Sequence, residues 1–226
     1  MIIKMHHTEL EGSTDGMQWV SIGDKEGLFK PGSSETEKCY YALSEYFDVP
    51  VCPTIDCEFE GVKGFVSVSL ENKRFKYVHI ADYYEQKTGR VYTSNLNSIK
   101  EILTPYTLEI LYNQMFLDAV MNQGDRHGGN IKVVLGLDKS LISIYPMYDN
   151  CSALKSNIGD YTILQYNENC ITHYDNLKML YDSQLCKDLF EKYKNVEFDN
   201  IVSKFTFGDY LIERKNKYLN KLINNK

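Results

Sequence analysis

Alternating apolar and polar positions predict strands in the first seventy residues of the chain. Segments 17–22 and 28–30 have strand-like composition and flank 23–27, which carries glycine at both ends and is typical of a hairpin turn. Segments 51–58 and 62–70 show a similar pattern, with a Glu-Gly pair between them. We therefore expect two antiparallel strand pairs in this part of the chain.

One helix is predicted between the two strand pairs. Apolar residues recur at three- and four-residue spacings from Cys39 to Phe47, which is the period of a helix with one buried face. Ser33 or Ser34 can cap its first turn, and the helix should stop before Pro50. The first part of the chain therefore predicts a small β-rich unit with a single helix.

The pattern changes after residue 71. Residues 72–100 are polar, rich in tyrosine and weakly periodic, so we place the junction between two lobes just before them. Thr104 and Pro105 then begin a helix that is apolar on most sides, as expected of a buried helix. This helix ends before Gly124 and leads into a polar loop that contains Asp125.

A hairpin and a helical region complete the chain. Segments 131–135 and 141–145 predict two strands that turn at 136–139, which would bring the residues on either side of the hairpin to the same end of the structure. Further helices are expected at roughly 175–194, 199–205 and 208–225. The pattern as a whole predicts an α+β, two-lobed fold, with a β-rich N-lobe at 1–71 and a mostly helical C-lobe at 72–226.

The composition is that of an ordinary soluble globular protein. Of the 226 residues, 43% are hydrophobic and 25% are charged. The net charge of −6 argues against nonspecific nucleic-acid binding, because no excess of cations is present to displace counterions from phosphates. We also expect no specific nucleic-acid partner. No apolar stretch is long enough to cross a bilayer, and the six cysteines form no Cys-x-x-Cys pair. We therefore expect a cytoplasmic protein without a transmembrane segment and with free thiols.

Three polar residues in the middle of the chain meet the needs of phosphoryl transfer from a magnesium nucleotide. Asp125 and Asn130 lie five positions apart in Gly124-Asp125-Arg126-His127-Gly128-Gly129-Asn130, and Asp149 follows the hairpin. In such reactions one carboxylate orients the attacking hydroxyl, while an amide and a second carboxylate hold the metal ions. We expect Asp125 to act on the acceptor hydroxyl and Asn130 and Asp149 to bind Mg²⁺.

Residues nearer the N-terminus are candidates for holding the nucleotide. Lys30 ends a strand, where a cation can reach phosphates, and Glu37 on the following helix could pair with it in preference to Glu35 or Glu45. The segment Gly12-Ser13-Thr14-Asp15-Gly16 could wrap phosphates with its backbone N–H groups. Each feature alone is equally compatible with solvated surface residues or an ordinary loop. Their order along the chain, together with the three central residues, favours a nucleotide site.

Other residues are expected to line the same site. Val68 and Leu70 come from the end of a predicted strand, and His127 and Tyr148 lie beside the candidate acids. We expect His127 mainly to pack within its loop and to hydrogen-bond with the backbone. Arg126 either pairs with a carboxylate or faces solvent, and the sequence leaves both interpretations open.

The central motif resembles that of a known family. Asp-x-His-x-x-Asn, followed by a hairpin and Pro-x-Tyr-Asp, is similar to the catalytic core of the HipA-like serine/threonine kinases. Upstream, Phe29-Lys30-Pro31, Glu37 and Val49-Pro50-Val51 resemble the lysine strand, the acidic helix and the following strand of that family. The resemblance implies a protein-kinase-like fold, ATP with Mg²⁺, and phosphorylation of serine or threonine hydroxyls in a protein.

The same resemblance bears on regulation and partners. Members of the family often phosphorylate a serine in the Gly/Ser loop, which makes Ser13 and Thr14 candidate sites. Several members are toxins of toxin–antitoxin pairs and others are secreted effectors, so the resemblance implies a protein substrate and raises an antitoxin or another regulatory protein as a partner. This chain is shorter than the longer members, and we expect a compact version of their core.

Two alternatives remain open. Gly-Asp-Arg-His-x-x-Asn also resembles the catalytic loop of phosphatidylinositol kinases, so a lipid or a small molecule could be the acceptor. Those enzymes end the next hairpin in Asp-Phe-Gly, whereas this chain has Asp149-Asn150 at that point. The second alternative is a nucleotide-binding module that keeps the fold without transferring phosphate.

Overall fold

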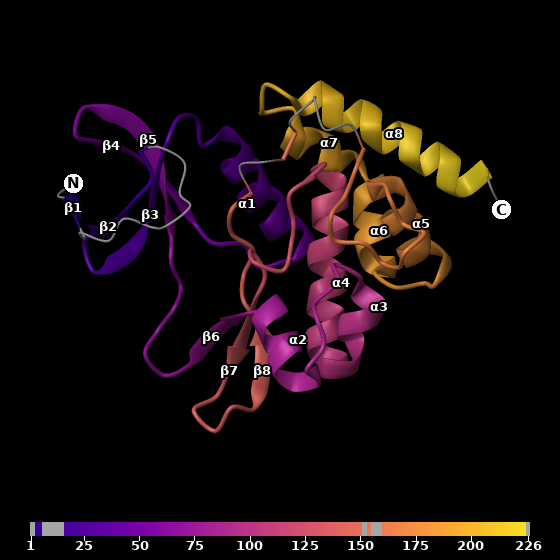
Figure 1. Cartoon of the computed structure of the whole chain (residues 1–226). Coiled ribbons are helices and arrows are strands. Elements are labelled where there is room, and N and C mark those ends of the chain that lie inside the picture. The colour runs from indigo at the N-terminus through magenta and orange to yellow at the C-terminus, as the bar shows by residue number, and fades with distance from the viewer. Residues whose placement is uncertain (1–2, 6–15, 151–152, 155–159, 225–226) are drawn as a thin grey trace.

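Five antiparallel strands form a sheet at the N-terminal end of the chain (Figure 1). The computed structural model describes residues 3–5, 16–150, 153–154 and 160–224, with the backbone alone at 3–5. The strands have the spatial order β1-β2-β3-β5-β4. Their bounds are β1 Ile3–Met5, β2 Gln18–Ile22, β3 Lys25–Pro31, β4 Thr54–Phe59 and β5 Val62–Val68.

The β2–β3 hairpin turns more tightly than the sequence predicts. β3 already begins at Lys25, so the turn consists of Gly23 and Asp24, and Gly23 has a φ of 64°. Gly27, expected in the turn, lies inside β3, where a Cβ atom would be 2.4 Å from Cγ1 of Val66. Gly27 is therefore explained by the close approach of β3 to β5, and the residues next to it in the sequence do not indicate this contact.

The second strand pair is present with shifted ends. β4 and β5 turn at Glu60-Gly61, as predicted, but β4 begins three residues later than expected. The preceding residues pair instead with the segment before Asp149, because the Cys52 N–H donates to the Met147 carbonyl at 2.8 Å and the Met147 N–H donates to the Pro50 carbonyl at 2.9 Å. This bridge ties the N-terminal part of the chain to the candidate site.

The predicted helix between the strand pairs is α1, Glu35–Phe47. The Ser33 hydroxyl accepts a hydrogen bond from the Glu35 N–H, and Asp48 ends the helix in a left-handed conformation with a φ of 61°. Its buried apolar face belongs to the large core of the molecule, where it packs against helices from the C-terminal part. α1 thus joins the five-stranded sheet to the helical part of the protein.

Residues 72–102 contain elements that the sequence did not predict. They are β6 (Lys76–His79), α2 (Ile80–Thr88), α3 (Leu96–Ile99) and the 3₁₀ turn η1 (Lys100–Ile102). β6 has only four residues and becomes a strand by pairing with β7, which lies more than fifty residues further along the chain. α2 is short and has only three fully buried side chains, so its periodicity is weak.

The long central helix is α4, Pro105–Val120, as predicted. Thr104 and Thr107 form a reciprocal cap at its first turn, and the helix is buried on most sides. In Figure 1 it stands between the five-stranded sheet and the C-terminal helices.

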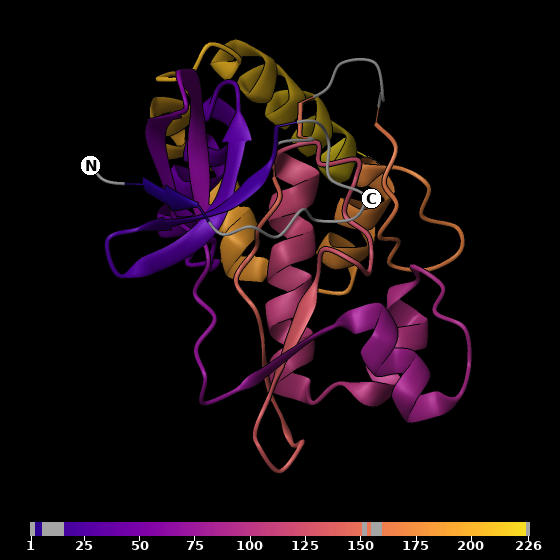
Figure 2. The same ribbon diagram turned by 60° about the vertical axis from the view of Figure 1, so that its left-hand side comes forward.

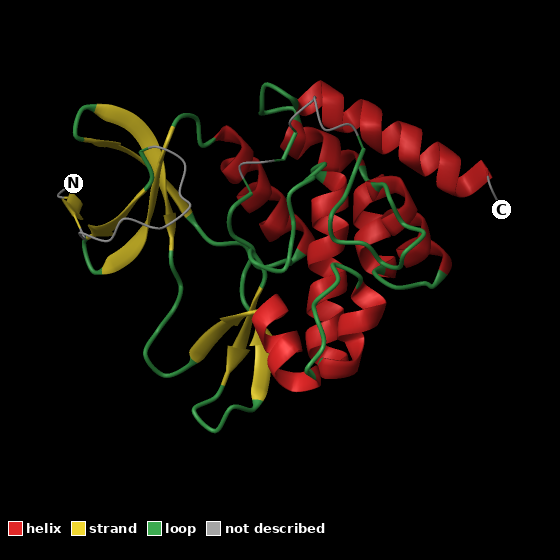
Figure 3. Ribbon diagram, in the orientation of Figure 1, coloured by secondary structure: helices red, strands yellow, loops and turns green. Residues whose placement is uncertain are grey.

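The predicted hairpin after α4 consists of β7 (Lys132–Leu135) and β8 (Leu141–Ile144), which form a second sheet in the order β6-β7-β8. Figure 3 shows the two sheets as separate groups of strands.

The C-terminal region is helical, but its first helix is divided. The helices are α5 His173–Asp182, α6 Lys187–Lys194, α7 Val196–Val202 and α8 Gly208–Asn224. The single helix predicted at 175–194 is wrong, because Gln184 and Cys186 take left-handed conformations with φ of 61° and 57° and turn the chain between α5 and α6. Figure 2 shows α8 crossing one end of α4.

The predicted α+β, two-lobed kinase-like architecture is confirmed at the level of the fold. A small core lies within the five-stranded sheet, while a much larger one surrounds α4. The lobe boundary placed after residue 71 stays a prediction. Within the described ranges, no helix is long and apolar enough to span a membrane. The five cysteines that the structure describes are free thiols.

Candidate active site

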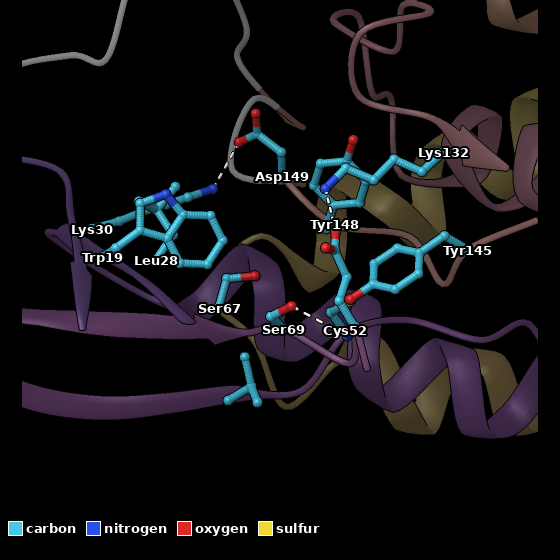
Figure 4. A pocket seen from close by; sticks show the side chains of 12 residues that line it. Trp19, Leu28, Lys30, Cys52, Ser67, Ser69, Lys132, Tyr145, Tyr148 and Asp149 are labelled. Atoms are coloured by element: carbon cyan, nitrogen blue, oxygen red, sulfur yellow. Dashed lines mark hydrogen bonds and ion pairs between the residues drawn. The ribbon is translucent and has the colours of Figure 1, made fainter. Parts of the chain in front are cut away.

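Lys30 and Asp149 meet although 119 positions separate them in the sequence. The Nζ atom of Lys30 lies 2.7 Å from Oδ1 of Asp149 and 3.9 Å from Oε1 of Glu37. Lys30 and Glu37 are almost fully buried, whereas the side chain of Asp149 is 44% exposed. Figure 4 shows Lys30 and Asp149 pointing toward each other at the cleft. Three of the predicted site residues are therefore brought together by the fold.

The position of Lys30 on β3 is set by close packing of the sheet. β3 pairs with β5, and Lys30 lies opposite Phe65. At the neighbouring position on β5, a Cβ atom on Gly64 would lie 2.3 Å from the Lys30 carbonyl oxygen and 2.8 Å from the Phe29 ring. The absence of a side chain at Gly64 therefore allows β3 to approach β5 closely where β3 presents the lysine.

Glu37 is held by Asn150, a residue that the sequence analysis did not single out for the site. The Asn150 backbone N–H donates to Oε1 of Glu37 at 2.9 Å, and its amide Nδ2 donates to Oε2 at 2.8 Å. Burial raises the pKa of the Glu37 carboxyl, while Lys30 and the two Asn150 hydrogen bonds act in the opposite direction. Both oxygens of this buried carboxylate are thus occupied.

The loop that carries Asp125 is closed by its own polar groups. The Asn130 amide Nδ2 donates to the Asp125 carbonyl at 2.8 Å, and its Oδ1 accepts from the His127 N–H at 2.9 Å. His127 Nδ1 in turn accepts from the Gly129 N–H at 3.0 Å. The contacts of His127 therefore agree with the packing and backbone bonding expected of it.

Gln123 connects this loop to Asp149. Its Oε1 accepts from the Asp125 N–H at 3.2 Å, and its Nε2 donates to the Asp149 carbonyl at 3.3 Å. Gln123 is fully buried at the end of the segment that follows α4. The two candidate acids are therefore held on either side of a single buried amide, an arrangement that no spacing in the sequence indicated.

Arg126 pairs with a carboxylate, which resolves the alternative that the sequence left open. Its guanidinium contacts Asp118 through Nε at 2.9 Å and through Nη2 at 3.0 Å, with Asp118 placed on α4. Burial by itself would lower the pKa of Arg126, but the charge and hydrogen bonds of Asp118 outweigh it and raise that pKa. Burial acts to raise the pKa of the Asp118 carboxyl, and Arg126 opposes this shift. The bidentate geometry favours the ionised pair.

Arg126 also fixes the backbone around the candidate acids. Its Nη1 donates to the Tyr148 carbonyl at 2.7 Å and lies 3.4 Å from the Asn130 carbonyl. Its Nη2 donates to Oδ1 of Asn150 at 2.6 Å. One buried cation therefore holds the ends of both segments that carry the predicted catalytic residues.

A cleft opens beside Lys30 and Asp149 (Figure 4). Trp19, Leu28 and Val68 line it from the sheet, and Tyr148 lines it from the other side. Two residues predicted to bind the nucleotide, Val68 and Tyr148, thus line the same cleft as Lys30 and Asp149. Leu70 does not line this cleft, and the residue is 42% exposed. Trp19 is the only tryptophan of the chain.

A second ion pair lies at the edge of the same cleft. Lys132 Nζ is 2.5 Å from Oε1 of Glu71 and lies over the rings of Tyr145 and Tyr148 at 5.8 and 5.1 Å from their centroids. Both charged residues line the cleft. The sequence analysis missed them, because β7 and the segment after β5 approach each other only in the folded protein.

The predicted Gly/Ser loop lies mostly outside the described residues. This applies to Gly12, Ser13 and Thr14, whereas Gly16 is described and has a φ of 89°. A Cβ atom on Gly16 would lie 3.4 Å from Cγ of Pro31, the residue after Lys30. The end of the predicted loop therefore lies next to the strand that carries the lysine.

The polar groups present are compatible with Mg²⁺. Asp149 offers a half-exposed carboxylate, and the Asn130 amide oxygen, which accepts one hydrogen bond, has a second lone pair. Among the described residues, no group of three or more His, Cys, Asp or Glu side chains could hold a metal ion. A magnesium ion that is bound mainly through substrate phosphates needs only one or two protein oxygens, so this donor set fits it.

Comparison with solved structures gives information on the fold. No protein-family model and no curated protein matches this sequence. Among solved structures, the proinflammatory kinase CtkA of Helicobacter pylori matches with a TM-score of 0.72 and 14% identity, over 98% of this chain and 93% of that one. A Shewanella oneidensis complex of HipA and HipB with operator DNA matches with a TM-score of 0.49 and 11% identity, over 92% of this chain and 61% of that one. The match to CtkA shows that the chain has a kinase-like fold.

Proposed function

We propose that this protein, which has a kinase-like fold, is a kinase that uses ATP and Mg²⁺ to phosphorylate serine or threonine hydroxyls of a protein. The observation that carries the proposal is that Lys30 contacts Asp149 at the cleft and lies near the buried carboxylate of Glu37. Asp125 is linked to this group through Gln123. A cation for phosphates, an acid for metal and an acid for the acceptor hydroxyl are the groups that phosphoryl transfer requires.

Each residue has a distinct part in the proposed reaction. Lys30 would neutralise charge on the nucleotide phosphates, and Glu37 would keep the ammonium group in place. Asp149 and Asn130 would hold the metal, and Asp125 would orient the acceptor hydroxyl and accept its proton. When bound, the magnesium nucleotide supplies the phosphoryl group and the positive charge that offsets it. The closed loop around Asn130 keeps Asp125 in a defined position.

The identity of the acceptor rests on the sequence resemblance. A protein serine or threonine is proposed because of the motif, and self-phosphorylation at Ser13 or Thr14 is proposed on the same ground. A regulatory partner such as an antitoxin, and a cytoplasmic location or secretion as an effector, likewise stay predictions.

Transfer of labelled phosphate from ATP tests the proposal directly. With Mg²⁺ present, the wild-type protein should label itself or a generic protein acceptor. Asp125→Asn should reduce the rate by roughly 10²- to 10⁴-fold, the usual contribution of a positioned acid–base group. It should leave ATP binding nearly unchanged, as measured by the fluorescence of Trp19. Asp149→Ala should abolish the magnesium-dependent part of ATP binding.

Asp138→Asn is the matched control, because Asp138 is an exposed turn residue of the β7–β8 hairpin. It should transfer phosphate at the wild-type rate. Labelling of phosphatidylinositol in preference to any protein would favour the lipid-kinase alternative. ATP binding without transfer to any acceptor would favour the non-catalytic module, and equal rates in Asp125→Asn and the wild type would contradict the proposed mechanism.

A further inference from the structure

Asn150 joins two oppositely charged side chains from distant parts of the chain. It is fully buried. Through its backbone N–H and its Nδ2 it donates to both oxygens of Glu37, at 2.9 and 2.8 Å. Its Oδ1 accepts from Nη2 of Arg126 at 2.6 Å. One amide therefore links the acidic helix α1 to the loop that carries Asp125.

The chemistry of this position suits an amide in particular. A primary amide presents a donor and an acceptor in one plane, so it can face an anion on one side and a cation on the other. A carboxylate of the same size would accept from Arg126 but would repel Glu37. An apolar side chain would leave both buried charged groups short of a hydrogen bond, which is costly away from water.

The contacts of Asn150 bear on the pairing of Lys30. Both Glu37 oxygens already accept hydrogen bonds from Asn150, and the Lys30 ammonium is 3.9 Å from the nearer one. The same ammonium lies 2.7 Å from Asp149. In this state, Asn150 holds the Glu37 carboxylate, and Lys30 makes its short contact with the carboxylate that we assign to the metal.

Asn150 also bears on the conformation of Asp149, its neighbour in the chain. Asp149 has a left-handed backbone with a φ of 58°, which is uncommon for residues other than glycine. Its carbonyl accepts from Gln123, and the next N–H is bonded to Glu37. These contacts on both sides hold Asp149 in that conformation. The side-chain hydrogen bonds of Asn150 in turn keep its backbone N–H in position to bond with Glu37.

We propose that Asn150 is a positioning residue that holds Asp149 in the orientation needed for the magnesium nucleotide. Through its bonds to Glu37, it also determines whether the Lys30 ammonium pairs closely with Glu37 or with Asp149. The proposal rests on the proposed function, because it concerns the same site. Asn150 acts through Glu37, Arg126 and Asp149 and touches no reacting atom.

The test uses Asn150→Asp in the full-length protein, with magnesium-dependent ATP binding followed by Trp19 fluorescence. This variant keeps the size of the side chain and the acceptor for Arg126, but it places a carboxylate against Glu37. We expect the Mg²⁺ concentration at half-saturation to rise roughly 10-fold and kcat to fall roughly 10- to 100-fold, the worth of a hydrogen bond to a charged group. A purely structural role would lower the folded fraction without moving the Mg²⁺ midpoint.

A paired exchange supplies a second readout. Adding Glu37→Gln to Asn150→Asp restores an amide facing a carboxylate, with donor and acceptor exchanged. We expect this double variant to bring the Mg²⁺ midpoint back toward the wild-type value, so that the effects of the two substitutions are strongly non-additive. Additive losses would show that positions 37 and 150 are not coupled and would overturn the proposal.

Asn220→Asp is the matched control, because Asn220 is an exposed residue of α8. It should leave the Mg²⁺ midpoint and kcat unchanged. If Asn150→Asp does not fold, Asn150→Ser, which adds no charge, is measured instead. Its Mg²⁺ midpoint should also rise and its kcat should also fall. A folded Asn150 variant with the wild-type midpoint and kcat overturns the proposal.

The failures of the two proposals are distinguishable. If the wild-type protein binds ATP and Mg²⁺ but transfers no phosphate, the proposed function fails, while the binding measurements still decide the role of Asn150. If the wild-type protein does not bind ATP with Mg²⁺, both proposals fail.

Discussion

Arg126 holds both carboxylate oxygens of Asp118, at 2.9 and 3.0 Å, and both side chains are almost fully buried. The pair anchors the loop that carries Asp125 to the central helix α4. Arg126→Met should therefore lower the free energy of unfolding by about 3–5 kcal/mol, because it leaves the Asp118 charge buried without its partner. Urea unfolding followed by circular dichroism measures this change.

Arg90→Met is the matched control for this substitution. Arg90 pairs with Glu101 on the surface, where the two side chains are 59% and 47% exposed. An exposed pair contributes less than about 1 kcal/mol, so the control should be nearly neutral. Equal losses in the two variants would show that the buried pair does not anchor the loop.

Lys30 is predicted to be the main cationic contact of the nucleotide phosphates. Lys30→Met removes a buried ammonium group from the edge of the cleft, and we expect the Kd for ATP to rise about 10-fold or more, as for loss of a charge-assisted hydrogen bond. Titration of Trp19 fluorescence with ATP measures the Kd. Lys63→Met serves as the control, since Lys63 is exposed on the adjacent strand β5. An unchanged Kd for Lys30→Met would contradict the assignment of the site.

His173 makes the stability of the protein dependent on pH. Burial, together with the charge of Arg214, lowers the pKa of His173 to about 3. The unfolded chain takes up a proton near pH 6.5, whereas the folded protein does not, so this group destabilises the fold as the pH falls from about 6.5 toward 3. Between pH 7.5 and 5.5, the wild type should lose about 1.4 kcal/mol through this residue.

Comparison with His173→Phe isolates that effect. Other groups titrate in both proteins and cancel in the difference, including Glu37, whose raised pKa acts in the opposite direction. Urea unfolding at the two pH values should therefore show a smaller loss in the variant. Parallel changes in the two proteins would mean that His173 takes up its proton in the folded state as well.

The sequence by itself determined the elements that depend on neighbouring residues. Thr104 and Pro105 indicate the start of α4, because helix capping depends on residues close together in the sequence. The apolar spacing from Cys39 to Phe47 indicates α1, because a few turns of sequence are enough to distinguish the buried face of a helix from its exposed face. The order of Lys30, Asp125 and Asp149 along the chain led to the prediction of one shared site. The first and last of these residues do meet, while the function of the site stays a prediction.

Only the tertiary structure decided which groups support that site. Gln123 and Asn150 carry no local signal, because an amide in a polar segment is typical of an exposed loop. Asp118 lies within the apolar helix α4, and its partner Arg126 is found only in the folded structure. β6 is a strand because it pairs with β7, more than fifty residues away in the sequence. Gly27 lies where β3 packs closely against Val66, and the residues next to Gly27 in the sequence do not indicate this contact. Local periodicity reports burial along one element, whereas a buried polar network depends on how separate elements pack together.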